Sequence, residues 1–138
     1  MTRRVYAEDT RVPIVQSRAS IETMLRKTGA ARIMSMDEAL EAVVLFMLAG
    51  RLIKLRVEIA GDASEQQRRA IWRAVLLVVK AKIEAVAQGI TTVEQEWLAH
   101  VVLPDGTTVG QWIEPRLQLA YDRGEMPTDP LLLEGPKP

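Results

Sequence analysis

Cysteine is absent from this sequence of 138 residues, histidine occurs once, and aromatic residues make up only 4% of the chain. The absence of cysteine excludes disulfides, thiol nucleophiles, iron–sulfur ligation and every cysteine-based zinc motif. It also removes the redox argument for a secreted protein, so the expected location is a reducing cytoplasm. A single histidine leaves few routes to a metal site or an acid–base relay. We therefore expect no metal and no cofactor.

Long hydrophobic runs are also missing. The longest ones, residues 42–50 and 74–79, are far shorter than the roughly 20 apolar residues that cross a bilayer. Residues 1–9 contain no apolar stretch of the kind found in signal peptides. The length fits one domain, and 48% apolar with 26% charged residues is typical of a globular protein. These features predict one soluble, cytoplasmic domain without a membrane segment.

Net charge is zero, but the charges are unevenly distributed along the chain. Residues 1–32 hold seven basic and three acidic side chains, whereas residues 101–138 hold three basic and six acidic ones. This asymmetry indicates either an anionic partner at the basic end or a fold in which the two ends meet. The sequence leaves both alternatives open.

The first half of the sequence predicts an extended arm, a helix and three strands. Pro13 and alternating apolar residues indicate an arm or edge strand over residues 1–16. Ser17 is placed as the N-cap of a helix over residues 18–28, which Gly29 ends. Ala49-Gly50 supplies a hairpin turn, and the connection at 37–41 is a loop or a helical turn. The strands are expected at residues 31–36, 42–48 and 51–59.

The last of these strands alternates strictly, which indicates one apolar and one solvated face. The apolar face carries Ile53, Leu55, Val57 and Ile59, and the other face carries Leu52, Lys54, Arg56 and Glu58. By contrast, residues 42–48 are apolar without interruption.

A long helix is predicted after the strands. Asp62 with Glu65 three residues later has the spacing of a capping box, and Gly89 ends the helix. Because residues 74–79 are apolar on nearly all sides, the helix is expected to be covered on two sides.

Two shorter helices follow. Thr92 is placed as the cap of a helix that ends near His100, and Thr108 as the cap of a last helix that Gly124 ends. Pro115 either kinks this last helix or belongs to its first turn. Strands followed by helices predict an α+β domain over residues 1–126, with a three-stranded antiparallel sheet packed by the helices on one face. Residues 127–138, rich in proline and leucine, form a tail.

Catalytic motifs are scarce. Glu96 and His100 lie four residues apart on a predicted helix, so a carboxylate could orient the single imidazole for proton transfer or metal binding. No second histidine completes a metal site, and the sequence lacks the common nucleophile and phosphate-binding motifs. A helix-end histidine that interacts with the helix dipole is the simpler interpretation. We therefore expect a protein that is not an enzyme and has no catalytic residue.

Basic residues give a first binding hypothesis. Cations on a solvated sheet face and at a helix start can contact phosphates. The helix–three strands–helix order of residues 17–87 is also that of double-stranded RNA-binding domains, although their basic lysine cluster is missing. The alternative is an ordinary solvated face whose arginines pair with Glu58 and Glu65. The predicted nucleic-acid-binding residues are Arg3, Arg4, Arg51, Lys54, Arg56, Arg68, Arg69 and Arg73.

The tail gives a second binding hypothesis. Leu131, Leu132 and Leu133 are flanked by prolines, and three adjacent leucines are costly to leave in water. They are expected to dock on their own domain, to add a strand to a partner, or to pair between protomers of a homo-oligomer.

Several segments resemble a family of small proteins from phages and prophages. They are residues 78–86 (VVKAKIEAV), 89–100 (GITTVEQEWLAH), 102–109 (VLPDGTTV), 6–10 (YAEDT) and 17–18 (SR). The family has no assigned activity, so no site residue is transferred from it. The resemblance implies a mobile-element origin and action in a bacterial cytoplasm. It fits an accessory protein that binds nucleic acid, or alternatively an effector that binds a host protein and inhibits or redirects it.

Overall fold

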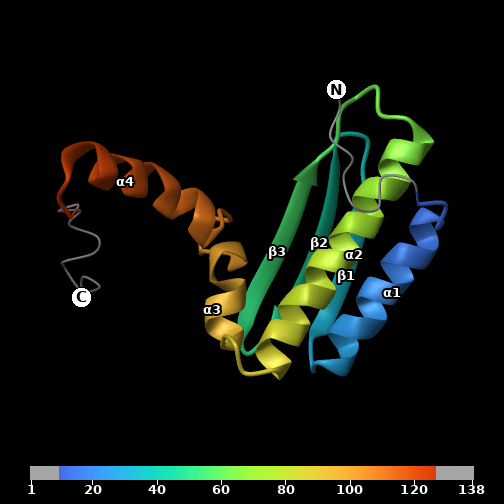
Figure 1. Ribbon diagram of the computed structural model, residues 1–138, viewed down its shortest axis with the longest axis horizontal. Helices are drawn as coiled ribbons and strands as arrows, with labels where there is room; N and C mark the ends of the chain where they lie inside the picture. The colour runs from blue at the N-terminus through green and yellow to red at the C-terminus, as the bar shows by residue number, and fades with distance from the viewer. Residues whose placement is uncertain (1–9, 127–138) are drawn as a thin grey trace.

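The protein has an α+β fold, as predicted, in which three strands are followed by helices (Figure 1). The computed structural model describes residues 10–126. The sheet is antiparallel with strand order β1-β2-β3. In chain order, the elements are α1 (Ile14–Lys27), β1 (Ala31–Asp37), β2 (Glu41–Leu48), β3 (Arg51–Glu58), α2 (Glu65–Ala87), α3 (Val93–Trp97), the 3-10 helix η1 (Leu98–His100) and α4 (Val109–Arg123).

The strands lie within one residue of their predicted ends. A two-residue turn joins β2 to β3, with Leu48 paired to Arg51. Both turn residues, Ala49 and Gly50, have positive φ, at 51° and 75°. This conformation matches the twist of a tight hairpin and explains the small residues at these positions. The connection between β1 and β2 is a turn rather than a helix.

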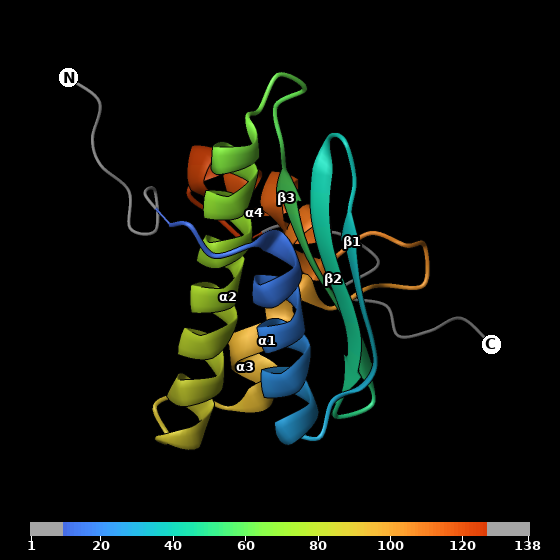
Figure 2. The ribbon, with the colours of Figure 1, turned by 90° about the vertical axis from the view of Figure 1, so that its right-hand side faces the viewer.

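The core lies between the sheet and two helices that cover the same face. In Figure 2, α1 and α2 lie together on one side of the three strands. Phe46 of β2 contacts Trp97 edge to face, with ring centroids 5.2 Å apart. The buried side chains of this core include Ile21, Leu25, Val44, Phe46, Ile53, Trp72, Val79 and Trp97.

Helix α1 begins earlier than predicted, which corrects the end of the extended arm and the N-cap. The helix starts at Ile14, directly after Pro13, whose φ of −58° suits an N-cap position and whose missing N–H costs the helix nothing. Ser17, predicted as the cap, is a fully buried residue inside the helix. Ser17 lies one helical turn before Ile21, so both residues belong to the buried face of the helix. Residues 1–9 of the predicted arm lie outside the described chain.

The start of α2 also differs from the prediction. Ser64, not Asp62, is the N-cap, with its Oγ accepting a hydrogen bond from the Gln67 backbone N–H at 3.0 Å. Gln67 Oε1 accepts from the Ser64 N–H at 2.7 Å, so the capping box is shifted by two residues. Ser64 has the extended backbone of an N-cap residue, and the helix begins at the next residue, Glu65.

Helix α2 packs on the sheet and also contacts α1 and α3, which agrees with the predicted cover on two sides. Its buried residues are Trp72, Val75, Leu76 and Val79, which face the sheet and α1. Val78, on the side towards β3, is exposed. Of residues 74–79, whose apolar character suggested cover on two sides, only Val78 is exposed.

The last helices form where they were predicted. Thr92 and Thr108 cap α3 and α4 through their side chains, and Gly124 ends α4 in the left-handed conformation. Pro115 lies inside α4 and not in its first turn. Helix α4 packs against η1 and then projects away from the sheet (Figure 1), and none of its residues is buried. Within residues 10–126, no helix is long and apolar enough to cross a membrane.

Candidate functional site

The outer face of the sheet, which points away from α1 and α2, is mainly apolar. On β1, Ser35 and Asp37 contact the helices, so Met34 and Met36 face outward. The strand register places Met34 beside Leu45, and Met36 beside Val43. Met34 is 54% exposed, and Leu52 on β3 is 39% exposed. We call this surface the outer patch. Its residues are Met34, Met36, Leu45, Met47 and Leu52, together with Val43, which is only 1% exposed.

Charged residues lie at one end of the outer patch. Arg56 of β3 donates through Nε to the Glu41 carboxylate and through a terminal nitrogen to the Glu58 carboxylate at 3.4 Å. These hydrogen bonds, the one to Glu41 first, raise the pKa of Arg56. Lys54 lies on the same face, opposite Leu45. The outer patch thus has an apolar centre and a charged rim, which is the usual composition of a protein–protein interface.

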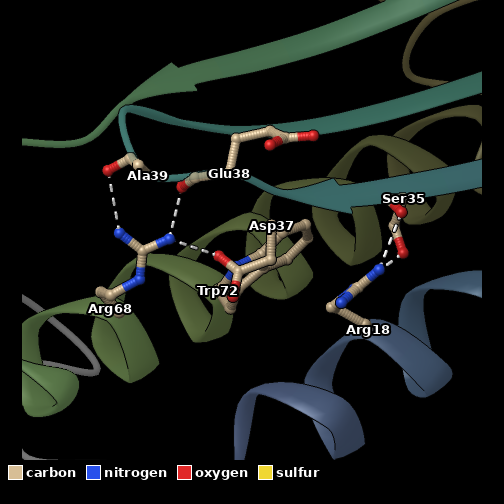
Figure 3. A network of polar contacts seen from close by, with 7 residues as sticks. All are labelled: Arg18, Ser35, Asp37, Glu38, Ala39, Arg68 and Trp72. Carbon is tan, nitrogen blue, oxygen red and sulfur yellow. Dashed lines mark hydrogen bonds and ion pairs between the residues drawn. The ribbon is translucent and has the colours of Figure 1, made fainter.

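Arg68, one of the predicted nucleic-acid contacts, binds the protein's own backbone instead (Figure 3). Its guanidinium donates to Asp37 Oδ1 at 2.7 Å and to the carbonyls of Glu38 and Ala39 at 2.5 and 3.1 Å. The Trp72 indole N–H donates to the same Asp37 oxygen at 3.0 Å. Arg68 therefore fastens the β1–β2 turn to α2, and both of its terminal nitrogens donate to residues of that turn and of β1.

A second polar contact of this kind was not predicted. Arg18 of α1 donates to the Ser35 Oγ and carbonyl at 2.9 and 2.8 Å, and its guanidinium lies 5.5 Å from the Trp72 ring centroid (Figure 3). Ser35 also donates to Glu22 at 3.3 Å. The sequence offers no signal for these contacts, because the partners lie 17 and 13 residues apart.

The other predicted basic residues are spread over both faces of the sheet. Arg51 pairs with Glu94 at 3.7 Å, and Arg69 pairs with Glu65 at 3.5 Å. Lys54 and Arg56 lie on the outer face, whereas Arg68, Arg69 and Arg73 belong to α2, which covers the opposite face. Within residues 10–126, Lys54 and Arg73 have no ion pair. Arg3 and Arg4, and the leucines 131–133, lie outside the described chain.

Glu96 and His100 do not form the predicted pair. Lys82 of α2 donates to the Glu96 carbonyl at 3.2 Å and to its carboxylate at 3.4 Å. Burial is the main cause that lowers the pKa of His100, and the Lys82 charge adds to it, while Glu96 opposes it. Among residues 10–126, no three acidic or histidine side chains gather in a way that could hold a metal ion.

His100 lies at an apolar groove between α2 and β3. The groove has a volume of about 310 Å³, and the imidazole ring of His100 forms part of its lining. Its other lining residues are Leu55, Arg56, Val57, Ile71, Ala74, Val75 and Val78. The neighbours of the imidazole are therefore mainly apolar, which favours its neutral form.

Comparisons with protein-family models, with curated proteins and with solved structures find no match to this chain. The resemblance to phage-encoded proteins therefore stays a prediction. The function is argued below from the residues of the chain itself.

Proposed function

We propose that this protein is a non-enzymatic protein-binding module that recognises a partner through the outer patch. The observation that carries the proposal is the composition of β2. Residues 42–48 of the strand are apolar on both sides of the sheet, yet α1 and α2 cover only one side, and on the other side Leu45 and Met47 remain partly exposed. Strands that are apolar on both faces normally lie between two layers of structure. A partner protein would supply the missing second layer.

The chemistry of the outer patch favours an amphipathic helix face as the partner surface. Sheets and helices pack in layers, and a helix with an apolar stripe is the common cover for a sheet. Three of the six residues of the patch are methionines (Met34, Met36 and Met47), which are flexible and adapt to different partner shapes. The paired charges of Arg56, Glu41 and Glu58 would fix orientation at the rim. The phage resemblance supports a host protein in a bacterial cytoplasm as this partner.

Nucleic-acid binding, the other hypothesis, has less support. It needs several available cations on one surface, since each phosphate contact contributes separately. Arg68 and Arg56 are each held by more than one partner, and Arg68 and Lys54 lie on opposite faces of the sheet. Fluorescence anisotropy with single- and double-stranded DNA and RNA over a salt series tests it. We expect no tight binding with a steep salt dependence.

Variants of exposed residues test the proposal. Purified wild-type protein and the variants M34E and V15E are used to capture proteins from bacterial cells, and the captured protein is purified for affinity measurements. Val15 lies on α1, away from the outer patch, and is 75% exposed, so V15E is the matched control. We expect M34E to lose at least tenfold in affinity and V15E to bind like wild type. Equal affinity of both variants for the captured protein would show that the partner does not bind through the outer patch.

A further inference from the structure

Strand β3 is an edge strand, and the direction of its backbone groups follows from the hairpin. Leu48 and Arg51 close the two-residue turn as a hydrogen-bonded pair. The N–H and C=O groups of the odd-numbered residues of β3 therefore point towards β2, and those of the even-numbered residues point to the free edge. The Val102 N–H agrees with this alternation, because it donates to the Leu52 carbonyl at 2.8 Å from the free side.

The chain itself covers only the first half of this edge. Val101 forms an antiparallel bridge with Ile53, and α3 and η1 lie beside this end of the strand (Figure 1). Further along β3, within residues 10–126, no other segment makes a hydrogen bond to the backbone of Arg56 or Glu58 on the free side. The second half of the edge thus presents unpaired donors and acceptors, which are a template for another extended chain.

The open half of the edge runs beside the apolar groove between α2 and β3. Leu55 and Val57 line the groove from the strand, and Val75 and Val78 line it from the helix. Val57 is 37% exposed, and Val78 is 46% exposed. A strand added to β3 would point every second side chain to the inner face of the sheet, and these side chains would enter the groove. The unpaired backbone and the groove therefore fit the same occupant.

We propose that an extended segment of a partner protein adds to β3 as a fourth, antiparallel strand, with two apolar side chains in the groove. Val101 already pairs with this edge in the antiparallel direction, so the added strand continues an existing pairing. The groove volume of about 310 Å³ is at the lower limit for ligand pockets and suits aliphatic side chains. This site is separate from the outer patch and does not rest on the proposed function.

Charges beside the edge define the sequence of the segment. The residue opposite Arg56 points to the outer face, with Lys54 diagonally next to it, so an acidic side chain there faces two cations. Lys54 has no ion pair within the described part of the chain. A basic side chain opposite Glu58 faces a carboxylate. Because an antiparallel segment passes Glu58 first, the favoured order is basic, apolar, acidic, apolar.

Selection from a library of short random peptides on the immobilised full-length protein tests the proposal. We expect the selected peptides to share the alternating order given above. They are then synthesised and titrated by calorimetry into wild type, V78E and V15E. V78E places a carboxylate in the groove, and V15E is the same substitution at an exposed position on α1. We expect V78E to lose at least tenfold in affinity and V15E to bind like wild type.

Amide hydrogen exchange, followed by NMR, tests the backbone pairing itself. In the free protein, the amides of Arg56 and Glu58 should exchange faster than those of Leu55 and Val57, which point towards β2. A saturating selected peptide should slow exchange at Arg56 and Glu58 at least tenfold, and have a smaller effect at Leu55 and Val57. N-methylation of the peptide residue opposite Arg56 should abolish binding, because it removes a donor to the edge.

Four results would each overturn the proposal. They are a selection without enriched peptides, selected peptides without alternating apolar residues, equal effects of V78E and V15E, and unchanged exchange at Arg56 and Glu58. M34E changes the outer patch and should bind the selected peptides like wild type. This proposal and the proposed function therefore fail separately.

Discussion

Arg68 shows how the use of a charged residue depends on contacts that lie far apart in the sequence. The side chain belongs to a run of helix-start arginines, which suggested phosphate binding. In the folded protein it contacts Asp37, which is 31 residues away, and two turn carbonyls. Its side chain is 17% exposed. Arg68 therefore acts mainly on stability.

This assignment predicts the effect of removing the guanidinium. R68M leaves the Asp37 carboxylate with one fewer donor and the turn carbonyls without their cation. We expect the free energy of unfolding to fall by about 1–3 kcal/mol, as for hydrogen bonds to charged groups. Urea denaturation measures this loss. R73M is the control, because Arg73 has no ion pair within residues 10–126, and it should change stability by no more than about 0.5 kcal/mol.

His100 should make stability depend on pH. Burial and Lys82 lower its pKa in the folded state, whereas the unfolded chain binds the proton near pH 6.5. Between the two pKa values the unfolded chain holds more protons, so the free energy of unfolding should fall as pH drops through about 6.5. Denaturation at several pH values should show this fall in wild type and a smaller one in H100Q. A histidine pKa at or above 6.5 by NMR titration would contradict the assignment.

At the scale of elements, the cap of α2 distinguishes the predicted start from the observed one. Ser64 accepts the Gln67 N–H, whereas Asp62 lies outside the helix. We expect S64A to lower the free energy of unfolding by about 1 kcal/mol, within the usual range for N-caps. D62A should have a clearly smaller effect. Thermal or urea denaturation compares the two variants. A larger loss of unfolding free energy in D62A than in S64A would indicate that Asp62 is the N-cap, as the sequence predicted.

The elements that were predicted well are those fixed by local pattern. The strict alternation of β3 and the Ala49-Gly50 turn determine the hairpin within a few residues of sequence, and Thr92 and Thr108 cap their own helices. The start of α1 was missed because a proline followed by apolar residues also fits an extended strand. The cover predicted for α2 agrees with its contacts to the sheet, α1 and α3, but the apolar run did not show that Val78 would stay exposed.

The candidate sites depended more on tertiary structure and were predicted less well. The pairing of Arg68 with Asp37, and of Lys82 with Glu96, brings together residues 31 and 14 positions apart. No local spacing indicates such pairs. The apolar residues of β2 were recognised as a continuous run, but only the position of α1 and α2 on the same face shows which of them the helices cover.

For the molecule as a whole, the outer patch should contribute to binding and little to stability. Met34 is more than half exposed, so its replacement removes few contacts within the domain. We expect M34E to change the free energy of unfolding by no more than about 0.5 kcal/mol, typical of exposed positions. Urea denaturation of M34E beside V44E, a buried core position, measures the contrast. A loss in M34E comparable to that in V44E would show that the patch is part of the core.

Site-specific crosslinking tests the central claim most directly. A photoreactive benzophenone amino acid replaces Met34 in the outer patch or Val15 on α1, and bacterial cells that produce each variant are irradiated. The account predicts one predominant adduct with another protein from position 34 and none from position 15. Equal adducts at both positions, adducts with nucleic acid, or a crosslink from position 34 only to a second copy of this chain would contradict it.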